Sequence, residues 1–323
     1  MSATTTADPI ALPTIDDVRD AAARIAPHAR VTPVLRSEVL DEMAGASLFF
    51  KCENLQRGGA FKFRGACNAV WSLGEDDASR GVVTHSSGNH GTALALAAGT
   101  RGIAAHVVVP EGAVQAKLDA ISRAGAILHR CAPTIAAREA MAADVQRQTG
   151  AVLVHPYVDP RVMAGQGTVA LELLAQAGPL DAVLVPVGGG GLVAGVAIAG
   201  HALQPGLVVH GAEPAGLDES ARSLAAGQRI TEFVPDTLCD GLRGTVGVPN
   251  FAAMREQHVA ITTVSDAECI AAMRLLWEQL KLVLEISSAT VLAALLKDRA
   301  RFAGQRVGLV LTGGNVDLGA LPW

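Results

Sequence analysis

A lysine set between two aromatic rings is the first residue of this sequence that could do chemistry. Lys62 stands between Phe61 and Phe63 in an otherwise apolar stretch. An amine removed from water has a lowered pKa and can form a Schiff base or act as a nucleophile. Lysine is nevertheless more often a solvated surface residue, so the local pattern alone favours a surface position.

Four consecutive glycines, Gly188–Gly191, could bind a phosphate. They lie between a predicted strand, Ala182–Val187, and a helix predicted to begin near Leu192. Glycines let the backbone turn sharply and present several N–H groups together, and the helix N-terminus adds its positive end. The run is neither GxGxxG nor a P-loop, since no Lys-Ser/Thr pair follows it. A tight turn needs fewer glycines, so we favour a phosphate cradle.

Two more turns of small residues follow predicted strands. Ser86–Gly91 (SSGNHG) comes after Gly81–His85, and Thr312–Asn315 (TGGN) comes after Arg306–Leu311. Ligands in open α/β sheets bind beyond the carboxyl ends of the strands, where both turns would lie. The first turn could equally cap a helix, and the second could be an ordinary strand end. Each is only suggestive by itself.

The elements that must position these residues alternate along the chain. Short apolar runs have the length of strands buried on both faces. They are Gly81–His85, His106–Pro110, Val152–Pro156, Ala182–Val187, Leu207–Gly211 and Arg306–Leu311. Longer segments with helical spacing are Thr92–Ala98, Gln115–Ala124, Thr134–Thr149 and Asp266–Leu282, the last after a capping-box pattern from Ser265 to Glu268. The alternation predicts an α/β fold with a mainly parallel sheet.

Composition narrows the class of protein. The 323 residues are 50% hydrophobic and 18% charged, which suffices for a substantial core. A net charge of −5, without a Lys/Arg cluster, and 3% aromatic residues argue against a nucleic-acid partner. Five scattered cysteines, and an N-terminus unlike a signal peptide, predict reduced thiols in the cytoplasm. Ala182–Gly200 is almost long enough to span a bilayer, but Pro186 and the glycines would break that helix, so no membrane partner is expected.

Taken together and in this order, the motifs resemble the fold-type II pyridoxal-phosphate enzymes, most of all the serine/threonine dehydratase and serine racemase group. The likeness runs from Thr32 to Asp317. It implies two α/β domains with mainly parallel open sheets, as in the tryptophan synthase β chain. Residues 1–72 and 159–323 would form a large cofactor domain, and residues 73–158 a small substrate-loop domain. It also implies pyridoxal 5'-phosphate, a small amino-acid substrate, and a homodimer or homotetramer.

The resemblance gives several residues a role at the cofactor. Lys62 resembles the lysine that carries the cofactor, and Phe61 the residue that packs beside its ring. Asn89 resembles the asparagine that hydrogen-bonds the ring hydroxyl, Thr312 stands near the ring nitrogen, and Glu285 matches a position close to the ring. A hydroxyl at that nitrogen, in place of a carboxylate, would favour loss of a β-substituent over transamination. The phosphate cup would be Gly188, Gly189, Gly190, Gly191 and Leu192.

Substrate-binding residues are implied in the same way. The substrate loop would be Ser86, Ser87, Gly88, Asn89 and His90. The freed Lys62 amine would remove the Cα proton as general base, and Ser87 matches the second base of the racemases. Arg243 could pair with a second substrate carboxylate, although a surface arginine is the commoner interpretation.

A cation site is the part of the resemblance that fits least closely. Glu213 and the carbonyl of Leu217 match two ligands, but Glu219 stands where the family has Asp. A longer carboxylate arm can still bind Mg²⁺ or Ca²⁺ through oxygen. A solvated acidic loop is the alternative, and the sequence leaves the two equally open. Ile286 is a second departure, since the family commonly has Pro there.

The expected activity is a pyridoxal-phosphate-dependent ammonia-lyase reaction. It would release a 2-keto acid and ammonia from L-threonine or L-serine; 3-hydroxyaspartate ammonia-lyase ranks second and serine racemase third. Tyr157, in HPYVDP, looks more like a dehydratase than a racemase. A homologue without catalysis would not need Lys62, and a nucleotide-binding Rossmann enzyme would need an acidic residue after a GxGxxG turn, which is missing.

Overall fold

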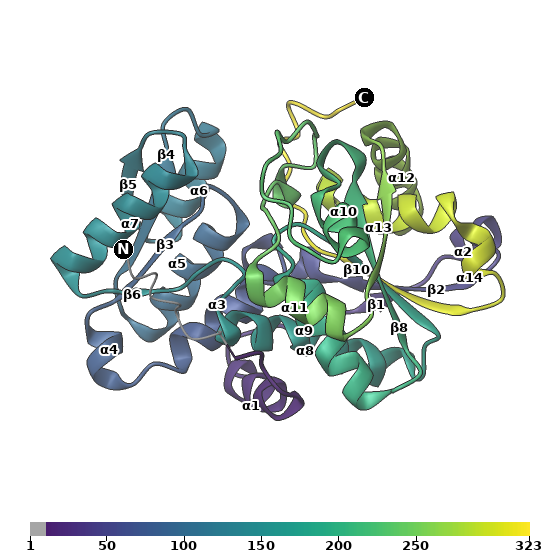
Figure 1. Cartoon of the computed structure of the whole chain (residues 1–323), viewed down its shortest axis with the longest axis horizontal. Coiled ribbons are helices and arrows are strands. Elements are labelled where there is room, and N and C mark those ends of the chain that lie inside the picture. The colour runs from purple at the N-terminus through teal and green to yellow at the C-terminus, as the bar shows by residue number, and fades with distance from the viewer. Residues whose placement is uncertain (1–10) are drawn as a thin grey trace.

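Two sheets organise the chain into two lobes. The computed structural model describes residues 11–323. In Figure 1 the smaller sheet and its helices form the lobe on the left, and the larger sheet lies in the lobe on the right. The first ten residues of the N-terminus expected not to be a signal peptide lie outside the described part.

The larger sheet has six strands in the order β1-β2-β10-β7-β8-β9. They are β1 (Val34–Leu35), β2 (Ser47–Cys52), β7 (Ala182–Pro186), β8 (Val208–Pro214), β9 (Ala260–Val264) and β10 (Arg306–Leu311). All pairs are parallel except β1 with β2. In the centre of the sheet, Leu309 of β10 pairs with Phe50 on one side and Leu184 on the other.

The smaller sheet has four parallel strands in the order β5-β4-β3-β6. They are β3 (Val82–His85), β4 (Ala105–Pro110), β5 (Ile127–Cys131) and β6 (Val152–Leu153). The predicted α/β fold with mainly parallel open sheets is therefore confirmed. Every strand of this sheet falls within residues 73–158, while the domain boundaries themselves stay a prediction.

Helices cover both sheets. Those that precede or flank the larger sheet are α1 (Ile15–Ile25), α2 (Glu38–Ala44), α3 (Lys62–Trp71), α8 (Pro160–Ala177), α9 (Gly191–Leu203), α10 (Glu219–Ala226), α11 (Val248–Glu256), α12 (Asp266–Leu280), α13 (Ile286–Lys297) and α14 (Arg299–Phe302). The smaller lobe contains α4 (Glu75–Ser79), α5 (Asn89–Arg101), α6 (Gln115–Arg123) and α7 (Ile135–Thr149). The predicted capping box is present, since Ser265 and Glu268 bond each other's backbone N–H groups.

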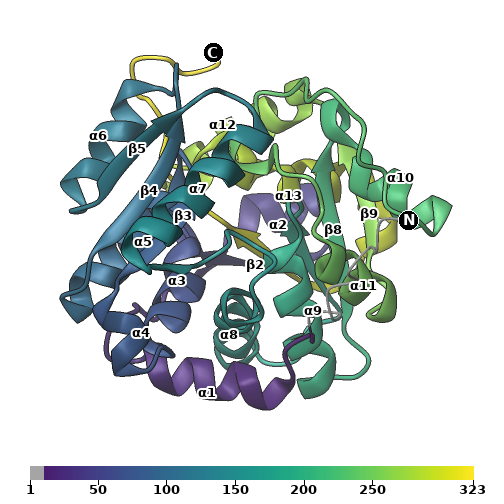
Figure 2. The same ribbon diagram turned by 60° about the vertical axis from the view of Figure 1, so that its left-hand side comes forward.

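Strand β7 explains why the central runs are apolar throughout. Leu184 points into one core, packed with α12 and α13, while Val183 and Val185 point into the other, packed with α8 and α9. Both faces of the strand are thus buried. Figure 2 shows α8 lying beside α1 on the outer side of this second core.

Two further expectations concern the glycine-containing stretch and the cysteines. Ala182–Gly200 folds as a strand, a turn and part of α9, and no helix within residues 11–323 combines the length and the apolar character needed to cross a membrane. All five cysteines are buried free thiols. Their reduced state stays a prediction.

Candidate active site

Lys62 is the first residue of α3 and is tied to the end of β10. The segment before it runs beside the turn that follows β10, with a bridge between Ala60 and Gly313. The N–H of Phe61 donates to the carbonyl of Thr312 at 3.0 Å. Backbone pairing therefore fixes Lys62 at the carboxyl end of the sheet, where α/β proteins bind ligands.

The amine of Lys62 lies in a poorly solvated place. Its Nζ donates to the carbonyl of Pro156 at 3.2 Å and lies 5.0 Å from the centre of the Phe61 ring. Burial lowers the pKa of Lys62 to about 8, against the opposing effect of the Glu285 carboxylate. Several described lysines form ion pairs, but Lys62 does not. The result is an amine that readily loses its proton near neutral pH.

The glycine turn presents free backbone donors. Gly190 is left-handed with φ 84°, and the 13-residue helix α9 begins at Gly191. Within residues 11–323, no protein atom accepts a hydrogen bond from the N–H groups of Gly188, Gly189 or Gly190. Unpaired N–H groups at a helix N-terminus suit an anion, so the turn fits the phosphate of the predicted cofactor.

Close packing explains why the turn consists of glycines. A Cβ at Gly188 would lie 2.9 Å from the Leu242 backbone, and one at Gly191 would lie 2.8 Å from the carbonyl of Tyr157. The Tyr157 ring lies directly on Gly189. Residues 155–158 thus touch both parts of the site, because the neighbouring Pro156 carbonyl accepts from Lys62. Any side chain in the turn would displace this contact.

A half-buried amide, Asn89, pairs with a buried carboxylate, Glu285, whose charge acts on the lysine. The Asn89 Nδ2 donates to both Glu285 oxygens, at 3.0 and 3.1 Å, and Asn315 donates to the Asn89 Oδ1 at 2.9 Å. Burial raises the pKa of Glu285 to about 7. Asn89 is thereby held in one orientation beside a group that can exist in either protonation state near neutral pH.

Thr312 lies at the carboxyl end of β10 and is 3% exposed. Its Oγ1 is 3.0 Å from the Oγ of Ser288, which also donates to the carbonyl of Gly313 at 2.7 Å. Ser288 is in the first turn of α13, three residues after Glu285. The predicted ring-nitrogen residue is thus supported by a second hydroxyl.

The substrate-loop residues follow β3 at the other side of the site. Ser86 accepts from the Gly88 N–H at 3.4 Å, and the Ser87 hydroxyl forms no hydrogen bond within the described residues. The N-cap of α5 is Gly88, which has no side chain to cap with, so helix capping does not explain the serines. His90 is buried and bonds the Val154 carbonyl, and burial holds its pKa well below the usual value.

Arg243 has a partner within its own loop. Its Nε and Nη2 donate to the carbonyl of Thr237 at 3.2 and 2.5 Å. The adjacent short helix η4 (Asp240–Leu242) packs on Gly188, and Asp240 forms an ion pair with Lys117 of α6. This pair joins the smaller lobe to the larger one at the mouth of the site.

Glu213 and Glu219 are the two residues predicted to bind a cation through their side chains, and both are buried. Glu213 and Glu219 are each 1% exposed, so the alternative of a solvated acidic loop is wrong. Glu213 accepts from the N–H groups of Ser220 and Ala221, whereas the Glu219 Oε2 has no partner within the described residues. Burial raises the pKa of both, that of Glu213 to about 7. Two neighbouring buried carboxylates are oxygen donors suited to a hard divalent cation, while the Leu217 carbonyl stays a predicted third ligand.

Sequence reasoning missed one cation beside the substrate loop. The Arg138 Nε, in the first turn of α7, is buried without a hydrogen-bond partner in the described part of the chain. Burial lowers the pKa of His85, and the charge of Arg138 adds to this effect. Since His85 directly precedes Ser86, Arg138 lies near the substrate loop. An isolated arginine in a helix that contains other charged residues gives no signal in the sequence.

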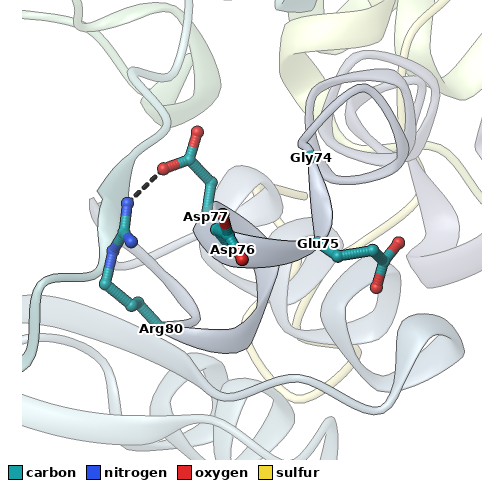
Figure 3. Close-up of a pocket in the computed structure, with 5 residues that line it drawn as sticks. All are labelled: Gly74, Glu75, Asp76, Asp77 and Arg80. Carbon is teal, nitrogen blue, oxygen red and sulfur yellow. Dashed lines mark hydrogen bonds and ion pairs between the residues drawn. The ribbon is translucent and has the colours of Figure 1, made fainter.

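A separate hollow lies away from these residues. Figure 3 shows it at α4, lined by Gly74, Glu75, Asp76, Asp77 and Arg80. Arg80 and Asp77 form an exposed ion pair there. None of the predicted site residues lines it, so it is a surface feature of the smaller lobe.

The site thus gathers residues that are far apart in sequence. Thr312 follows β10, Gly188 follows β7, and Ser86 follows β3. Lys62 is held next to Thr312 by the hydrogen bond from the Phe61 N–H. The Lys62–Pro156 and Asn89–Glu285 hydrogen bonds therefore bring together the carboxyl ends of parallel strands from two sheets, along with the Lys62 amine and a set of anion donors. This is the arrangement of an enzyme that holds a phosphorylated aldehyde.

Comparison with known proteins agrees with this geometry. Residues 25–313 match the family described as "Pyridoxal-phosphate dependent enzyme". The chain belongs to this family, in its fold-type II branch. It is 48% identical over 312 residues to the beta-hydroxyaspartate dehydratase of Paracoccus denitrificans (strain Pd 1222), which covers 97% of this chain and 99% of that protein. It is also 48% identical over 309 residues to the serine racemase of Arabidopsis thaliana, covering 94% and 93%.

Solved structures extend the comparison. Maize serine racemase superposes with a TM-score of 0.94 at 44% identity, covering 96% of this chain and 95% of that one. The serine racemase of Dictyostelium discoideum has a TM-score of 0.91 at 44% identity, covering 95% and 100%. A threonine deaminase also superposes, with a TM-score of 0.90 at 42% identity, covering 95% and 99%. The predictions of family, cofactor and enzyme class are therefore confirmed.

Proposed function

We propose that this enzyme eliminates water from a small β-hydroxy amino acid and yields a 2-keto acid and ammonia. The observation that carries the proposal is the Lys62 amine, whose pKa is lowered to about 8 and which forms no ion pair with a described residue. A pairing carboxylate would have kept it protonated. Such an amine can bind an aldehyde and, once free, can accept a proton.

The residues that would hold pyridoxal 5'-phosphate surround Lys62 and the glycine turn. Gly188–Gly191 would bind the phosphate, Asn89 and Thr312 would contact the ring, and Phe61 would pack beside it. When bound, the cofactor supplies an aldehyde for Lys62 or the substrate amine and a ring that accepts electrons. The Lys62 amine would take the Cα proton and give it to the departing β-hydroxyl, which leaves as water.

Arg138 favours a substrate with a second carboxylate. The Arg138 Nε is a buried donor without a partner among the described residues, and a carboxylate would satisfy it best. L-Serine and L-threonine have no such group, whereas 3-hydroxyaspartate does. We therefore place 3-hydroxyaspartate ahead of serine and threonine, an order that the name of the Paracoccus relative also supports.

The test is a comparison of kcat/KM for keto-acid release from 3-hydroxyaspartate, L-serine and L-threonine. We expect Arg138→Met to lower kcat/KM at least tenfold for 3-hydroxyaspartate and far less for serine. Arg147→Met, in the exposed part of the same helix, is the matched control. Absence of keto acid from all three substrates would refute the dehydratase proposal, and equal losses on all substrates would refute the role of Arg138.

Serine racemization is the second candidate activity, because Ser87 has a free hydroxyl beside the substrate loop. A racemase needs a second base on the face opposite the lysine. We expect any D-serine formed from L-serine to disappear in Ser87→Ala while pyruvate release persists. D-Serine accumulation as the sole product of the unaltered enzyme would make racemase the primary function.

Other features of the proposal concern assembly. We expect a large domain of residues 1–72 and 159–323 and a small one of residues 73–158, in line with the two sheets. Reduced buried cysteines are compatible with a cytoplasmic location. A homodimer or homotetramer would be tested by light scattering on the purified protein. The pair Glu213 and Glu219 would hold Mg²⁺ or Ca²⁺.

A further inference from the structure

Asn250, in the first turns of α11, is a fully buried amide beside the glycine turn. Its Nδ2 donates to the carbonyl of Tyr157 at 2.9 Å and to the carbonyl of Gly189. Both partners are acceptors, so the nitrogen of the amide must face them and the orientation of the side chain is unambiguous. Its Oδ1 has no partner within residues 11–323. The two donated bonds are therefore the hydrogen bonds that this side chain makes in the described structure.

The contact with Gly189 sets the direction of a cradle donor. In a trans peptide, the carbonyl of one residue and the N–H of the next point to opposite sides. By holding the Gly189 carbonyl, which also accepts from Gly247 at 3.2 Å, Asn250 turns the Gly190 N–H away from α11. The Gly190 N–H, like those of Gly188 and Gly189, donates to no atom of residues 11–323.

The contact with Tyr157 ties the cradle to the amine. Tyr157 belongs to residues 155–158, whose Pro156 carbonyl accepts from the Lys62 Nζ at 3.2 Å. The Tyr157 ring lies on Gly189, and its carbonyl lies against Gly191. One side chain thus holds the turn that binds the amine and the turn that presents the N–H groups.

We propose that Asn250 is a positioning residue that aims the backbone donors of the glycine turn at the phosphate of the cofactor. The inference rests on the proposed function, since it takes the glycine turn as the phosphate site. If Asn250 only stabilised the fold, its replacement would weaken the binding of ligands with and without a phosphate alike. If Asn250 positions the backbone donors, its replacement must weaken the binding of ligands with a phosphate selectively.

The experiment compares pyridoxal phosphate with pyridoxal, which has the same aldehyde and no phosphate. Dissociation constants are measured by absorbance titration of the full-length protein after removal of the cofactor. The variants are Asn250→Asp, which keeps the shape but replaces the donor by an acceptor, and Asn250→Ala. Gln204→Ala is the matched control, because the Gln204 amide also bonds a loop backbone, that of Leu180, at the opposite end of the same strand–helix unit.

We expect both Asn250 variants to bind pyridoxal phosphate about 10- to 100-fold more weakly, the effect of an unpaired buried carbonyl. Pyridoxal binding should change by less than about twofold, and Gln204→Ala should bind both ligands as the unaltered protein does. Equal weakening for both ligands, or none for either, would overturn the inference. Failure of the unaltered protein to bind pyridoxal phosphate at Lys62 would instead refute the proposed function.

A second measurement does not depend on the stability of the variants. Tyr157 is the only tyrosine of the chain, so fluorotyrosine labelling gives a single ¹⁹F signal from the cradle. In the unaltered protein, inorganic phosphate should shift this signal and compete with pyridoxal phosphate. A signal that responds to pyridoxal phosphate but not to inorganic phosphate would contradict a cradle aimed at the phosphate.

Discussion

The backbone N–H of Phe61 donates to the carbonyl of Thr312 at 3.0 Å, although 251 positions separate the two residues. This bond joins the residue before Lys62 to the residue after β10. The amine, the Thr312 hydroxyl and the glycine turn are consequently fixed to one sheet. The substrate loop at Ser86 comes from the other sheet, so the larger lobe would hold most of the cofactor, while the smaller lobe would supply the substrate loop and Asn89.

Replacing Lys62 by Arg should abolish activity without unfolding the protein. Arg keeps the charge and length of the side chain, but it cannot form a Schiff base or accept a proton at neutral pH. We expect the absorbance band of the bound aldehyde to be lost and keto-acid release to fall at least 10³-fold. Borohydride treatment followed by peptide mass mapping should label the unaltered protein at Lys62. Label at another lysine would contradict the assignment.

Adding one methyl group at the glycine turn should weaken cofactor binding. The new Cβ of Gly189→Ala would collide with the Tyr157 ring close to its attachment point, where the side chain cannot move away. We expect a loss of about 1–3 kcal/mol in unfolding free energy and weaker binding of pyridoxal phosphate. Gly99→Ala, in α5 with open space around it, is the control and should be neutral or slightly stabilising. Equal behaviour of the two variants would disprove close packing at Gly189.

A buried ion-pair cluster behind the site should dominate the stability of α3. Arg64 and Glu53 are both fully buried and lie 2.7 Å apart, and Glu172 also pairs with Arg64 at 2.7 Å. Arg64→Met would leave the buried Glu53 carboxylate without its ion-pair partner, at a cost of about 3–5 kcal/mol. Arg222→Met removes an exposed pair and should cost less than about 1 kcal/mol. Urea unfolding of both variants checks this, and a loss below about 1 kcal/mol for Arg64→Met would show that the cluster relaxes.

The stability of the cation-free protein should fall as pH rises through neutrality. Burial raises the pKa of Glu213 from the usual 4.5 to about 7, so the folded state holds a proton that the unfolded state has lost. Its contribution is fully present below about pH 4.5 and is lost as pH rises through 7. Mg²⁺ or Ca²⁺ would replace that proton, so either ion should raise Tm more at pH 8 than at pH 5.

Glu213→Gln separates this group from other titrating residues such as Glu285. The variant should lose both the pH-dependent part of Tm and the response to the cation, since an amide neither titrates nor balances the charge of the ion. Chelation with EDTA at pH 8 should lower the Tm of the unaltered protein only. An equal cation effect at pH 5 and pH 8 would argue against binding at these carboxylates.

Sequence patterns predicted the centre of the fold better than its edges. Strands β7 and β10 were found because both of their faces are buried and their residues are apolar throughout. The edge strands β5 and β9 were missed, because half-exposed strands contain polar residues such as His129 and Thr262. Strand β2 was missed because of Lys51, whose buried charge is neutralised by Glu172, 121 residues away.

The site was predictable where one short motif contained the chemistry. Lys62 and the glycine turn each carry a local signal, namely flanking rings and repeated small residues. The contacts that tune them were not predictable, since Pro156 and Glu285 approach Lys62 only through tertiary structure. Arg138 and Asn250 have no distinctive neighbours in sequence; only burial without a full set of partners makes them visible.

The carbonyl that accepts from Lys62 belongs to a connection between the lobes. Pro156 lies between β6 of the smaller sheet and α8 of the larger lobe. If the smaller lobe moved relative to the larger one to admit an amino acid, the movement would strain the Lys62–Pro156 bond and the Lys117–Asp240 pair. The same movement would then break the hydrogen bond of the Lys62 amine as the substrate enters. Opening of the enzyme and release of its base would be coupled.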